Sequence, residues 1–452
     1  MRRVYAFVIL LVALSLTCAC ASEITKQVLD NGVTVIVKPE KGSGLVAIVA
    51  TVRAGAAQET FQTAGIGNFV SQLLLASTRP SSAEEVAAVA DEVGGSISAQ
   101  WHQDYTEIRA VTTSYLFNRA MALIGESLTE ANFEDKWVEQ VRAKLLRDVR
   151  AVDDDVFEGS YADLRGLLYE DNGYRRPGLG FERAVELATP QDLRKYYATH
   201  YIPSNMVIAI AGDVTLEQAI DRVNKAFAGI PKGKLPFNRG VPDEKLDRSK
   251  FHASEADIRA AYLMVGWLAP GATSTDYPAM TVASAALGGG KGSVMFRELR
   301  QKRGMGYDLG TLYPRLKNQS HLLAYIITDP FKTAGFSANP NLAIEEVRTA
   351  LLEQVNQLSK KPLSPEDLQR AKGYAIGTYS LSHQHLLERA SELAWLETIG
   401  AGYEMYKSFA DQVDKVTAEE VQRVANTYLT NYAAVLLLPK TQSSSPAQRK
   451  TD

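Results

Sequence analysis

Two short stretches of this sequence contain residue types that could bind a metal ion or a phosphate group. His385 and Glu388 supply the first part of an H-x-x-E-H zinc pattern, but Arg389 stands where the second histidine would be. The chain has six histidines without another close pair, and we interpret His383 and His385 as residues on a helix surface. Residues 288–293 are rich in glycine but lack the G-x-x-x-x-G-K-[ST] spacing, so we expect a loop before a helix. Neither stretch predicts a site.

A third stretch, residues 65–76, places polar side chains on an otherwise apolar helix. The apolar residues recur at the spacing of one helix face and are Ile66, Phe69, Val70, Leu73 and Leu74. Asn68, Ser71 and Gln72 lie between them. Carboxamides bind zinc poorly beside imidazole or thiolate ligands, and a serine hydroxyl cannot act as the general base that a glutamate provides. We therefore interpret the three polar residues as a hydrogen-bonded stripe.

The first residues have the layout of a secretory signal. Arg2 and Arg3 precede an apolar run that ends near Leu16, and small residues follow. The run is shorter than the ~20 residues that span a bilayer, so residues 1–21 predict export, to the periplasm. Residues 19–21 fit an A-x-A cleavage site, whereas the residues that end at Cys20 resemble a lipoprotein box, which would acylate that cysteine and give the only membrane contact. Both cysteines lie in this segment, so no disulfide is expected in the mature chain.

Length and composition limit the remaining function classes. A chain of 452 residues is long enough for two domains of about 200 residues each. With 46% hydrophobic and 22% charged residues, the composition is that of an ordinary globular protein. The net charge of -3 gives no support to nucleic-acid binding, which needs a clustered positive surface.

The order of predicted elements indicates an internal duplication. We predict an N-terminal domain over residues 22–230, a linker rich in Pro, Gly and charge over 231–250, a C-terminal domain over 251–440, and a disordered tail over 441–452. Near the end of both domains, a threonine with an acid three residues later precedes a helix, a tyrosine and a strand. The two threonines are Thr189 and Thr417.

Hydrophobic periodicity and turn residues predict the elements themselves. Asn31-Gly32 between apolar alternations predicts a hairpin of strands over residues 24–29 and 33–37. Further strands are expected at residues 45–52, 97–111, 206–212, 260–267, 307–313, 322–328 and 433–438. Helices are expected at residues 65–76, 83–93, 117–153, 216–227, 277–287 and 294–302, with long helices after residue 328.

Two stretches of the N-terminal domain resemble motifs of the M16 peptidases, the insulinase and mitochondrial processing peptidase family of M16B type. Residues 65–74 are similar to the family's zinc helix, G-[LI]-[AS]-H-x-x-E-H, and residues 173–180 to its Y-G-R-P-x-x-G loop, with Arg175 in place of a glycine. By this resemblance Asn68 and Gln72 occupy the positions of the two histidines, and Ser71 occupies that of the glutamate between them. Asp148 occupies the position of the third ligand. The resemblance therefore implies a degenerate zinc site and no metal in this chain.

A second resemblance lies in the C-terminal half. Residues 296–307 are similar to the family segment F-x-x-L-R-x-x-x-G-x-x-Y, in which the arginine and the tyrosine reach over the zinc site of the opposite domain. The match assigns these roles to Arg300 and Tyr307. A guanidinium and a phenol could anchor a peptide and stabilise the oxyanion that forms when water attacks its carbonyl. Alternatively, Arg300 caps its helix and Tyr307 is an ordinary strand aromatic.

The resemblance implies a fold and two functions. The fold is α+β, with two similar M16-type domains, each a mainly antiparallel sheet covered by helices. The first function is that of a non-catalytic subunit in a heterodimeric zinc peptidase that cleaves peptides or unfolded proteins, with zinc held by the H-x-x-E-H motif of a partner chain. The second is that of a non-enzymatic scaffold or peptide-binding protein. A self-sufficient peptidase with a relocated metal site would need another cluster of ligands, which the sequence does not offer.

Overall fold

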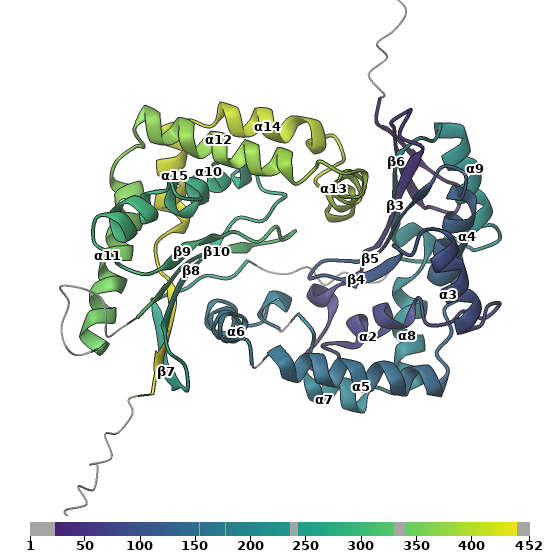
Figure 1. Ribbon diagram of the computed structural model, residues 1–452, viewed down its shortest axis with the longest axis horizontal. Helices are drawn as coiled ribbons and strands as arrows, with labels where there is room; N and C mark the ends of the chain where they lie inside the picture. Colours follow the sequence, from purple (N-terminus) through teal and green to yellow (C-terminus); the bar gives the residue numbers. More distant parts are fainter. Residues whose placement is uncertain (1–22, 153, 177, 236–242, 330–339, 441–452) are drawn as a thin grey trace, which may run out of the picture.

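The structure is a computed structural model that describes residues 23–440 except 153, 177, 236–242 and 330–339. It has two halves that face each other, each built from a twisted sheet with helices packed on it (Figure 1). The predicted signal with Cys20 and the predicted tail lie outside the described residues, as does part of the predicted linker. Among the described helices, none is long and apolar enough to cross a membrane.

The first sheet has six strands within the described residues, in the order β1-β2-β6-β3-β5-β4. The strands are β1 (Thr25–Val28), β2 (Thr34–Pro39), β3 (Leu45–Val52), β4 (Ser98–Trp101), β5 (Thr106–Thr113) and β6 (Met206–Gly212). β1 and β2 form the hairpin predicted from Asn31-Gly32, with Val28 opposite Thr34. β2 and β6 are parallel, whereas the other neighbours are antiparallel.

The second sheet repeats this arrangement with five strands in the described part of the chain, in the order β7-β11-β8-β10-β9. The strands are β7 (Lys250–Ala256), β8 (Ala261–Ala269), β9 (Asp308–Leu312), β10 (Ser320–Thr328) and β11 (Ala433–Pro439). The pair of β7 and β11 is parallel and the rest are antiparallel, as in the first sheet. The predicted α+β fold with two similar, mainly antiparallel domains is confirmed. β7 begins at the last residue of the predicted linker, and the exact domain boundaries stay predictions.

Helices of the same half cover one face of each sheet and bury its apolar residues. The helices of the first half are α2 (Ile66–Leu73), α3 (Ala83–Glu92), α4 (Phe117–Thr129), α5 (Asp135–Val152), α6 (Val156–Leu168), α7 (Glu182–Leu187), α8 (Pro190–His200) and α9 (Leu216–Ala226). Those of the second half are α10 (Tyr277–Gly288), the π-helix η4 (Phe296–Gln301), α11 (Pro340–Lys360), α12 (Pro365–Leu381), α13 (Leu386–Ile399), α14 (Met405–Lys415) and α15 (Ala418–Tyr428). Capping boxes at Thr189 and Thr417 begin α8 and α15, as the sequence repeat predicts.

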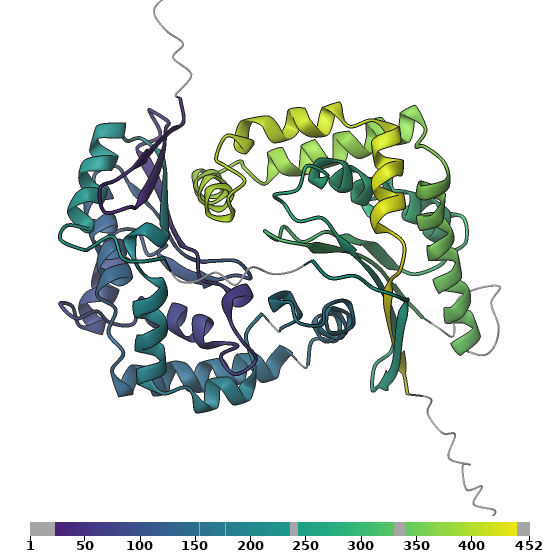
Figure 2. The same cartoon turned by 180° about the vertical axis from the view of Figure 1, so that it is seen from behind.

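The two halves exchange one helix each. α6 of the first half packs on β8 and β11 of the second sheet, and α13 of the second half packs on β3 and β6 of the first (Figure 2). At the second contact, the hydroxyl groups of Thr51 and Thr398 lie 2.5 Å apart. At the first, the ring of His321 lies between the hydroxyl groups of Tyr161 and Tyr169, at 2.7 and 2.9 Å. This exchange fixes the space between the halves.

The sequence prediction of one strand over residues 97–111 is wrong. The structure has two antiparallel strands there, β4 and β5, with a turn at residues 102–105 between them. The turn contains no glycine or proline. Instead the buried carboxylate of Asp104 ties it to distant residues, because it accepts hydrogen bonds from the Tyr174 hydroxyl at 2.5 Å and from the Lys317 backbone N–H at 2.9 Å.

Candidate functional site

Helix α2 carries the polar positions that the sequence singles out, and its start is fixed by close backbone packing. Gly65 precedes the helix with a φ of 109°, a conformation that glycine adopts without strain. A side chain at Gly180, in the loop that resembles an M16 motif, would lie 2.3 Å from the Gly65 Cα. The helix packs against β4, α5 and α8. The two sequence motifs therefore meet at the beginning of α2.

A buried carboxylate closes the N-terminus of this helix. Glu59 accepts hydrogen bonds from the backbone N–H groups of Gly65 at 2.9 Å and Gly67 at 2.6 Å. Burial raises the pKa of Glu59 to about 8, although the two backbone donors and the nearby charge of Arg176 oppose the shift. Arg176 also donates to the backbone carbonyl of Glu59 and so connects the second motif to this turn.

The side chains at the first two polar positions, Asn68 and Ser71, make hydrogen bonds within the protein. Asn68 is 3% exposed and donates from Nδ2 to the carbonyl of Leu179 at 3.3 Å. Ser71 is fully buried and donates from Oγ to the carbonyl of Asn68 at 2.7 Å. Neither side chain has an imidazole or carboxylate to offer. The two residues thus form part of the predicted hydrogen-bonded stripe of Asn68, Ser71 and Gln72.

The other two positions, Gln72 and Asp148, come together around a lysine. The ammonium group of Lys144 donates to Gln72 Oε1 at 2.9 Å and lies 3.5 Å from Asp148 Oδ2. Lys144 and Asp148 are one turn apart on α5, and their side chains are 51% and 44% exposed. Sequence reasoning missed Lys144, because a lysine on an exposed helix face is ordinary until the packing of α5 against α2 is known.

This donor set does not fit a zinc ion. Zinc sites in proteins use imidazole, thiolate or carboxylate ligands at about 2.0–2.3 Å, and the four positions here supply two amides, a hydroxyl and one carboxylate. The carboxylate already pairs with the ammonium group of Lys144. A dication beside that fixed positive charge would be repelled. Within the described residues, no group of three or more His, Cys, Asp or Glu side chains could hold a metal elsewhere.

Arg300 and Tyr307 lie in one local turn of the second half. Arg300 is in η4, and its guanidinium donates to the carbonyl of Gly306, the residue before Tyr307. Tyr307 comes directly before β9 and is 55% exposed. Burial raises the pKa of its phenol, with smaller contributions from Tyr262 and Asp308. The structure therefore brings the two predicted residues together with an accessible phenol.

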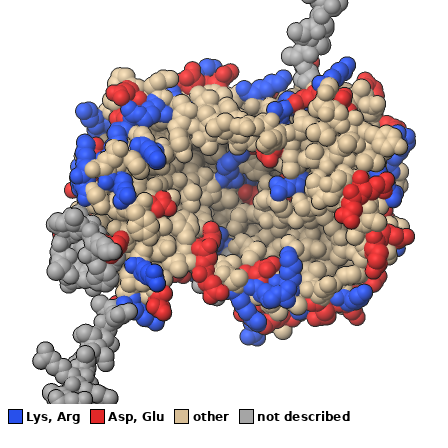
Figure 3. Space-filling view, viewed as in Figure 1, with Lys and Arg blue, Asp and Glu red and all other residues tan. Residues whose placement is uncertain are grey.

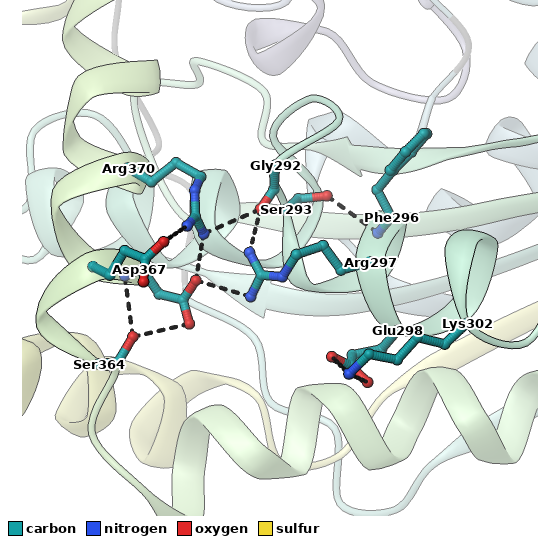
Figure 4. A network of polar contacts seen from close by, with 10 residues as sticks. Gly292, Ser293, Phe296, Arg297, Glu298, Lys302, Ser364, Asp367 and Arg370 are labelled. Carbon is teal, nitrogen blue, oxygen red and sulfur yellow. Dashed lines mark hydrogen bonds and ion pairs between the residues drawn. The ribbon is translucent and has the colours of Figure 1, made fainter.

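A network of ion pairs holds η4 against α12. Figure 4 shows the guanidinium groups of Arg297 and Arg370 on either side of the Asp367 carboxylate, at 2.8 and 2.5 Å. Both arginines also donate to the carbonyl of Gly292 in the glycine-rich loop. Arg297 and Arg300 lie on the same short helix. The network therefore holds the backbone from which the Arg300 side chain extends.

A cavity of about 410 Å³ lies between the two halves, and we call it the interdomain cavity. The first half lines it with charged residues of the β4–β5 hairpin that include Glu107 and Arg109, and the second half adds Arg315 and Glu392. Figure 3 shows basic and acidic side chains within the hollow at the centre of the molecule. Charged groups from both halves thus face one space.

Arg315 and Glu392 form an ion pair that sequence reasoning missed. Arg315 Nη2 lies 2.6 and 2.8 Å from the two carboxylate oxygens of Glu392, and its guanidinium lies 3.8 Å from the centre of the Trp395 ring. Burial acts to raise the pKa of Glu392, but the charge of Arg315 and a hydrogen bond from His383 outweigh it and the pKa is lowered. The interpretation of His383 as a helix-surface residue is wrong, because its side chain is 9% exposed and lies in the turn between α12 and α13.

Comparison with known proteins identifies the family. The model described as "Insulinase (Peptidase family M16)" matches residues 34–169, and the model described as "Peptidase M16 inactive domain" matches residues 188–374. These two matches follow one another along the chain, and the second begins within the first half, so that it includes β6 and α9 as well as much of the second half. The chain belongs to the M16 peptidase family.

Relatives and solved structures of M16 proteins agree over most of the chain. An uncharacterized zinc protease of Streptomyces coelicolor is 25% identical over 392 residues, which cover 83% of this chain and 80% of the relative. The crystal structure of a protease from Helicobacter pylori has a TM-score of 0.82 at 19% identity and covers 93% of this chain and 100% of its own. A structure from Pseudomonas fluorescens, titled as a peptidase M16 inactive domain, has a TM-score of 0.82 at 17% identity and covers 93% and 98%.

Proposed function

We propose that this M16 protein is the non-catalytic subunit of a heterodimeric zinc peptidase. A partner chain with an H-x-x-E-H motif holds the zinc ion and activates the water, and this chain contributes peptide-binding surface together with Arg300 and Tyr307. The observation that carries the proposal is the contact between helices α2 and α5, where two amides and a hydroxyl of α2 and the ammonium group of Lys144 on α5 stand in place of a metal site.

Strand β4 is the proposed place where a substrate peptide binds. It is the edge of the first sheet and, within the described residues, pairs only with β5. All four of its residues are partly exposed, and it lies directly beside α2. A peptide that adds to such an edge gains backbone hydrogen bonds with little demand on its sequence. This mode suits a peptidase for peptides or unfolded proteins of varied sequence.

Arg300 and Tyr307 are proposed to act on a peptide bound at the partner's zinc ion. Cleavage converts the peptide carbonyl to an oxyanion, which a phenol O–H can stabilise by a hydrogen bond. A guanidinium offers several donors in a fixed plane and can anchor a carbonyl or carboxylate of the same peptide. The exposure of Tyr307 and its short connection to Arg300 through Gly306 support a joint role.

The proposed location follows from the sequence of the first residues. The basic start, apolar run and small residues over 1–21 support export to the periplasm. Acylation at Cys20 would tether the protein to a membrane by a lipid, with the folded halves outside the bilayer.

Reconstitution tests the proposal. We expect the purified chain alone to cleave no peptides, and a mixture with an H-x-x-E-H partner purified from the same source to cleave them. In the mixture, Arg300→Ala and Tyr307→Phe should each lower kcat/KM by about 100-fold, the usual effect of losing one oxyanion donor. Arg303→Ala is the matched control, since Arg303 lies in the same segment and makes an exposed ion pair with Glu353 at 3.2 Å.

Two results would decide against this function. If the Arg300 and Tyr307 variants cleave at the rate of the unaltered chain while the partner is active, their proposed role is wrong. If the native protein purifies with no H-x-x-E-H chain, it is instead a scaffold or peptide-binding protein without enzymatic function.

A further inference from the structure

Helix α10 occupies the same place in the second half as α2 does in the first. α2 packs against β4, α5 and α8, and α10 packs in the same way against β9, α12 and α15. α8 and α15 are the two helices that begin at the repeated threonine caps. The space between α10 and its neighbours is therefore the counterpart of the degenerate zinc site.

This space contains a cavity of about 260 Å³, which we call the aromatic cavity. Six aromatic side chains line it, namely Tyr277, Tyr313, Tyr374, Tyr379, Trp395 and Phe409. Its volume lies below the roughly 300–1,000 Å³ of sites for drug-sized ligands. A cavity of this size suits a single large side chain.

One wall of the aromatic cavity belongs to an edge strand. β9 pairs only with β10 within the described residues. Thr311 and Tyr313, two residues apart, line the cavity, whereas Leu312 between them is 39% exposed. Since side chains alternate along a strand, a peptide added to the free edge of β9 would direct every second side chain toward the cavity.

Polar groups in the wall favour an aromatic side chain that carries a donor. The Arg315–Glu392 pair lines the cavity, with the arginine over the face of Trp395. Thr378 and Ser382, which carry hydroxyl groups, are exposed residues that also line the cavity. A phenol or indole buried among aromatic rings usually finds a hydrogen-bond partner for its O–H or N–H, and these groups can supply one.

The glycine-rich stretch that superficially suggested a phosphate loop forms part of the rim. A side chain at Gly289 would lie 2.8 Å from Cδ1 of Tyr374, and one at Gly290 would lie 2.9 Å from Cε2 of the same ring. The bare backbone thus lets the Tyr374 ring, which is 46% exposed, lie against it at the cavity mouth. The expected loop is observed, and its glycines make room for an aromatic residue.

We infer that the aromatic cavity binds one aromatic side chain, preferably Tyr or Trp, of a peptide that adds as a strand to β9. The inference deepens the proposed peptide-binding role of this chain and rests on it. It makes the second half a peptide-binding half in its own right, with the cavity selecting one position of the peptide. Binding there needs neither the partner chain nor its zinc ion.

Fluorescence anisotropy of the full chain with short labelled peptides tests the inference. The peptides alternate Thr and Lys and differ only at one central position, which is Tyr, Trp or Ala. We expect the Tyr and Trp peptides to bind about tenfold or more tightly than the Ala peptide, because only they bury a ring. Thr378→Phe fills the cavity from α12 and should reduce the Tyr peptide to the affinity of the Ala peptide. Gln369→Phe adds the same bulk to an exposed position of α12 and should change nothing.

Three outcomes would overturn the inference. They are equal affinity for the Tyr and Ala peptides, unchanged binding by a folded Thr378→Phe chain, and binding of N-acetyltryptophanamide as tight as that of the Trp peptide. The last result would assign the cavity to a free aromatic compound rather than to a peptide strand. Because no cleavage is measured, failure here is distinct from failure of the heterodimer, which would show as absent activity in the mixture.

Discussion

The two halves share one arrangement of elements but fill the same position differently. Between α2 and α5 the first half has an exposed polar bridge, in which Lys144 joins Gln72 to Asp148. Between α10 and α12 the second half has the aromatic cavity, bounded by the buried Glu392 and its partner Arg315. The polar bridge lies outside the apolar core of the first half, whereas Tyr277, Trp395 and Phe409 of the aromatic cavity belong to the core of the second half. The comparison teaches that function in a duplicated fold depends on a few side chains between these two pairs of helices.

The largest expected effect comes from rebuilding the first half's site. In a chain with Asn68→His, Ser71→Glu, Gln72→His and Asp148→Glu, the family's donor set is present again. With Lys144→Ala added, we expect one zinc ion per chain in calorimetric titration. With Lys144 retained, the affinity should be at least about tenfold weaker, because the ammonium group repels the dication. Equal affinities would show that Lys144 does not determine whether the site accepts a metal.

The next effect concerns the acids at the starts of the equivalent helices. The pKa of buried Glu59 is raised to about 8, so this residue stabilises the fold most below its ordinary pKa of about 4.5. That contribution is lost as the pH rises through about 8, and it amounts to several kcal/mol over the whole window. In the Glu59→Gln variant, the free energy of unfolding should decrease less between pH 5 and pH 8 than it does in the unaltered chain. Urea denaturation at each pH measures this free energy.

Asp276, the N-cap of α10, should behave in the opposite way. A hydrogen bond from Arg423 lowers its pKa, so its contribution is present above its ordinary pKa and is lost as the pH falls below about 4. Asp276→Asn should therefore leave the slope between pH 5 and 8 unchanged. If both variants change that slope alike, the assigned difference between the two helix starts is wrong.

A third effect separates an ion pair whose carboxylate is buried from one in which both partners are exposed. Arg315→Ala leaves Glu392, which is 5% exposed, without its main partner. We expect a loss of about 2–3 kcal/mol in the free energy of unfolding, below the full cost of breaking a buried pair because Arg315 faces a cavity. Arg303→Ala breaks an exposed pair of the same half and should cost about 0–1 kcal/mol. Equal losses would contradict the assigned burial.

The smallest effect is expected for Lys144→Ala in the otherwise unaltered chain. Its two contacts are half exposed, so the free energy of unfolding should change by about 0.5 kcal/mol or less. Lys225→Ala, which breaks a similar pair with Asp221 on α9, is the control. A loss of several kcal/mol for Lys144→Ala alone would mean that the lysine bridge is part of the structural core of the first half.

Much of the fold was predictable from local patterns. The hairpin at Asn31-Gly32 and the capped helices at Thr189 and Thr417 depend on residues that are neighbours in sequence. The split of residues 97–111 into two strands was not predictable, because Asp104 finds its partners Tyr174 and Lys317 only in the folded chain.

The site was predictable in part for the same reason. The replaced positions Asn68, Ser71 and Gln72 follow from a motif within one helix, and Arg300 and Tyr307 from one segment. Lys144 and the pair of Arg315 and Glu392 depend on how separate helices and strands pack, since the two members of that pair are 77 residues apart. Their residue types alone carry no signal for a site.

Zinc retention by the unaltered chain tests the central claim most directly. The full chain would be incubated with zinc, dialysed, and analysed by inductively coupled plasma mass spectrometry, alone and as the Gln72→Ala and Asp148→Ala variants. The account predicts far less than one zinc ion per chain and the same trace in all three proteins. One tightly held zinc ion per chain, lost in either variant and accompanied by peptide cleavage without a partner, would contradict it.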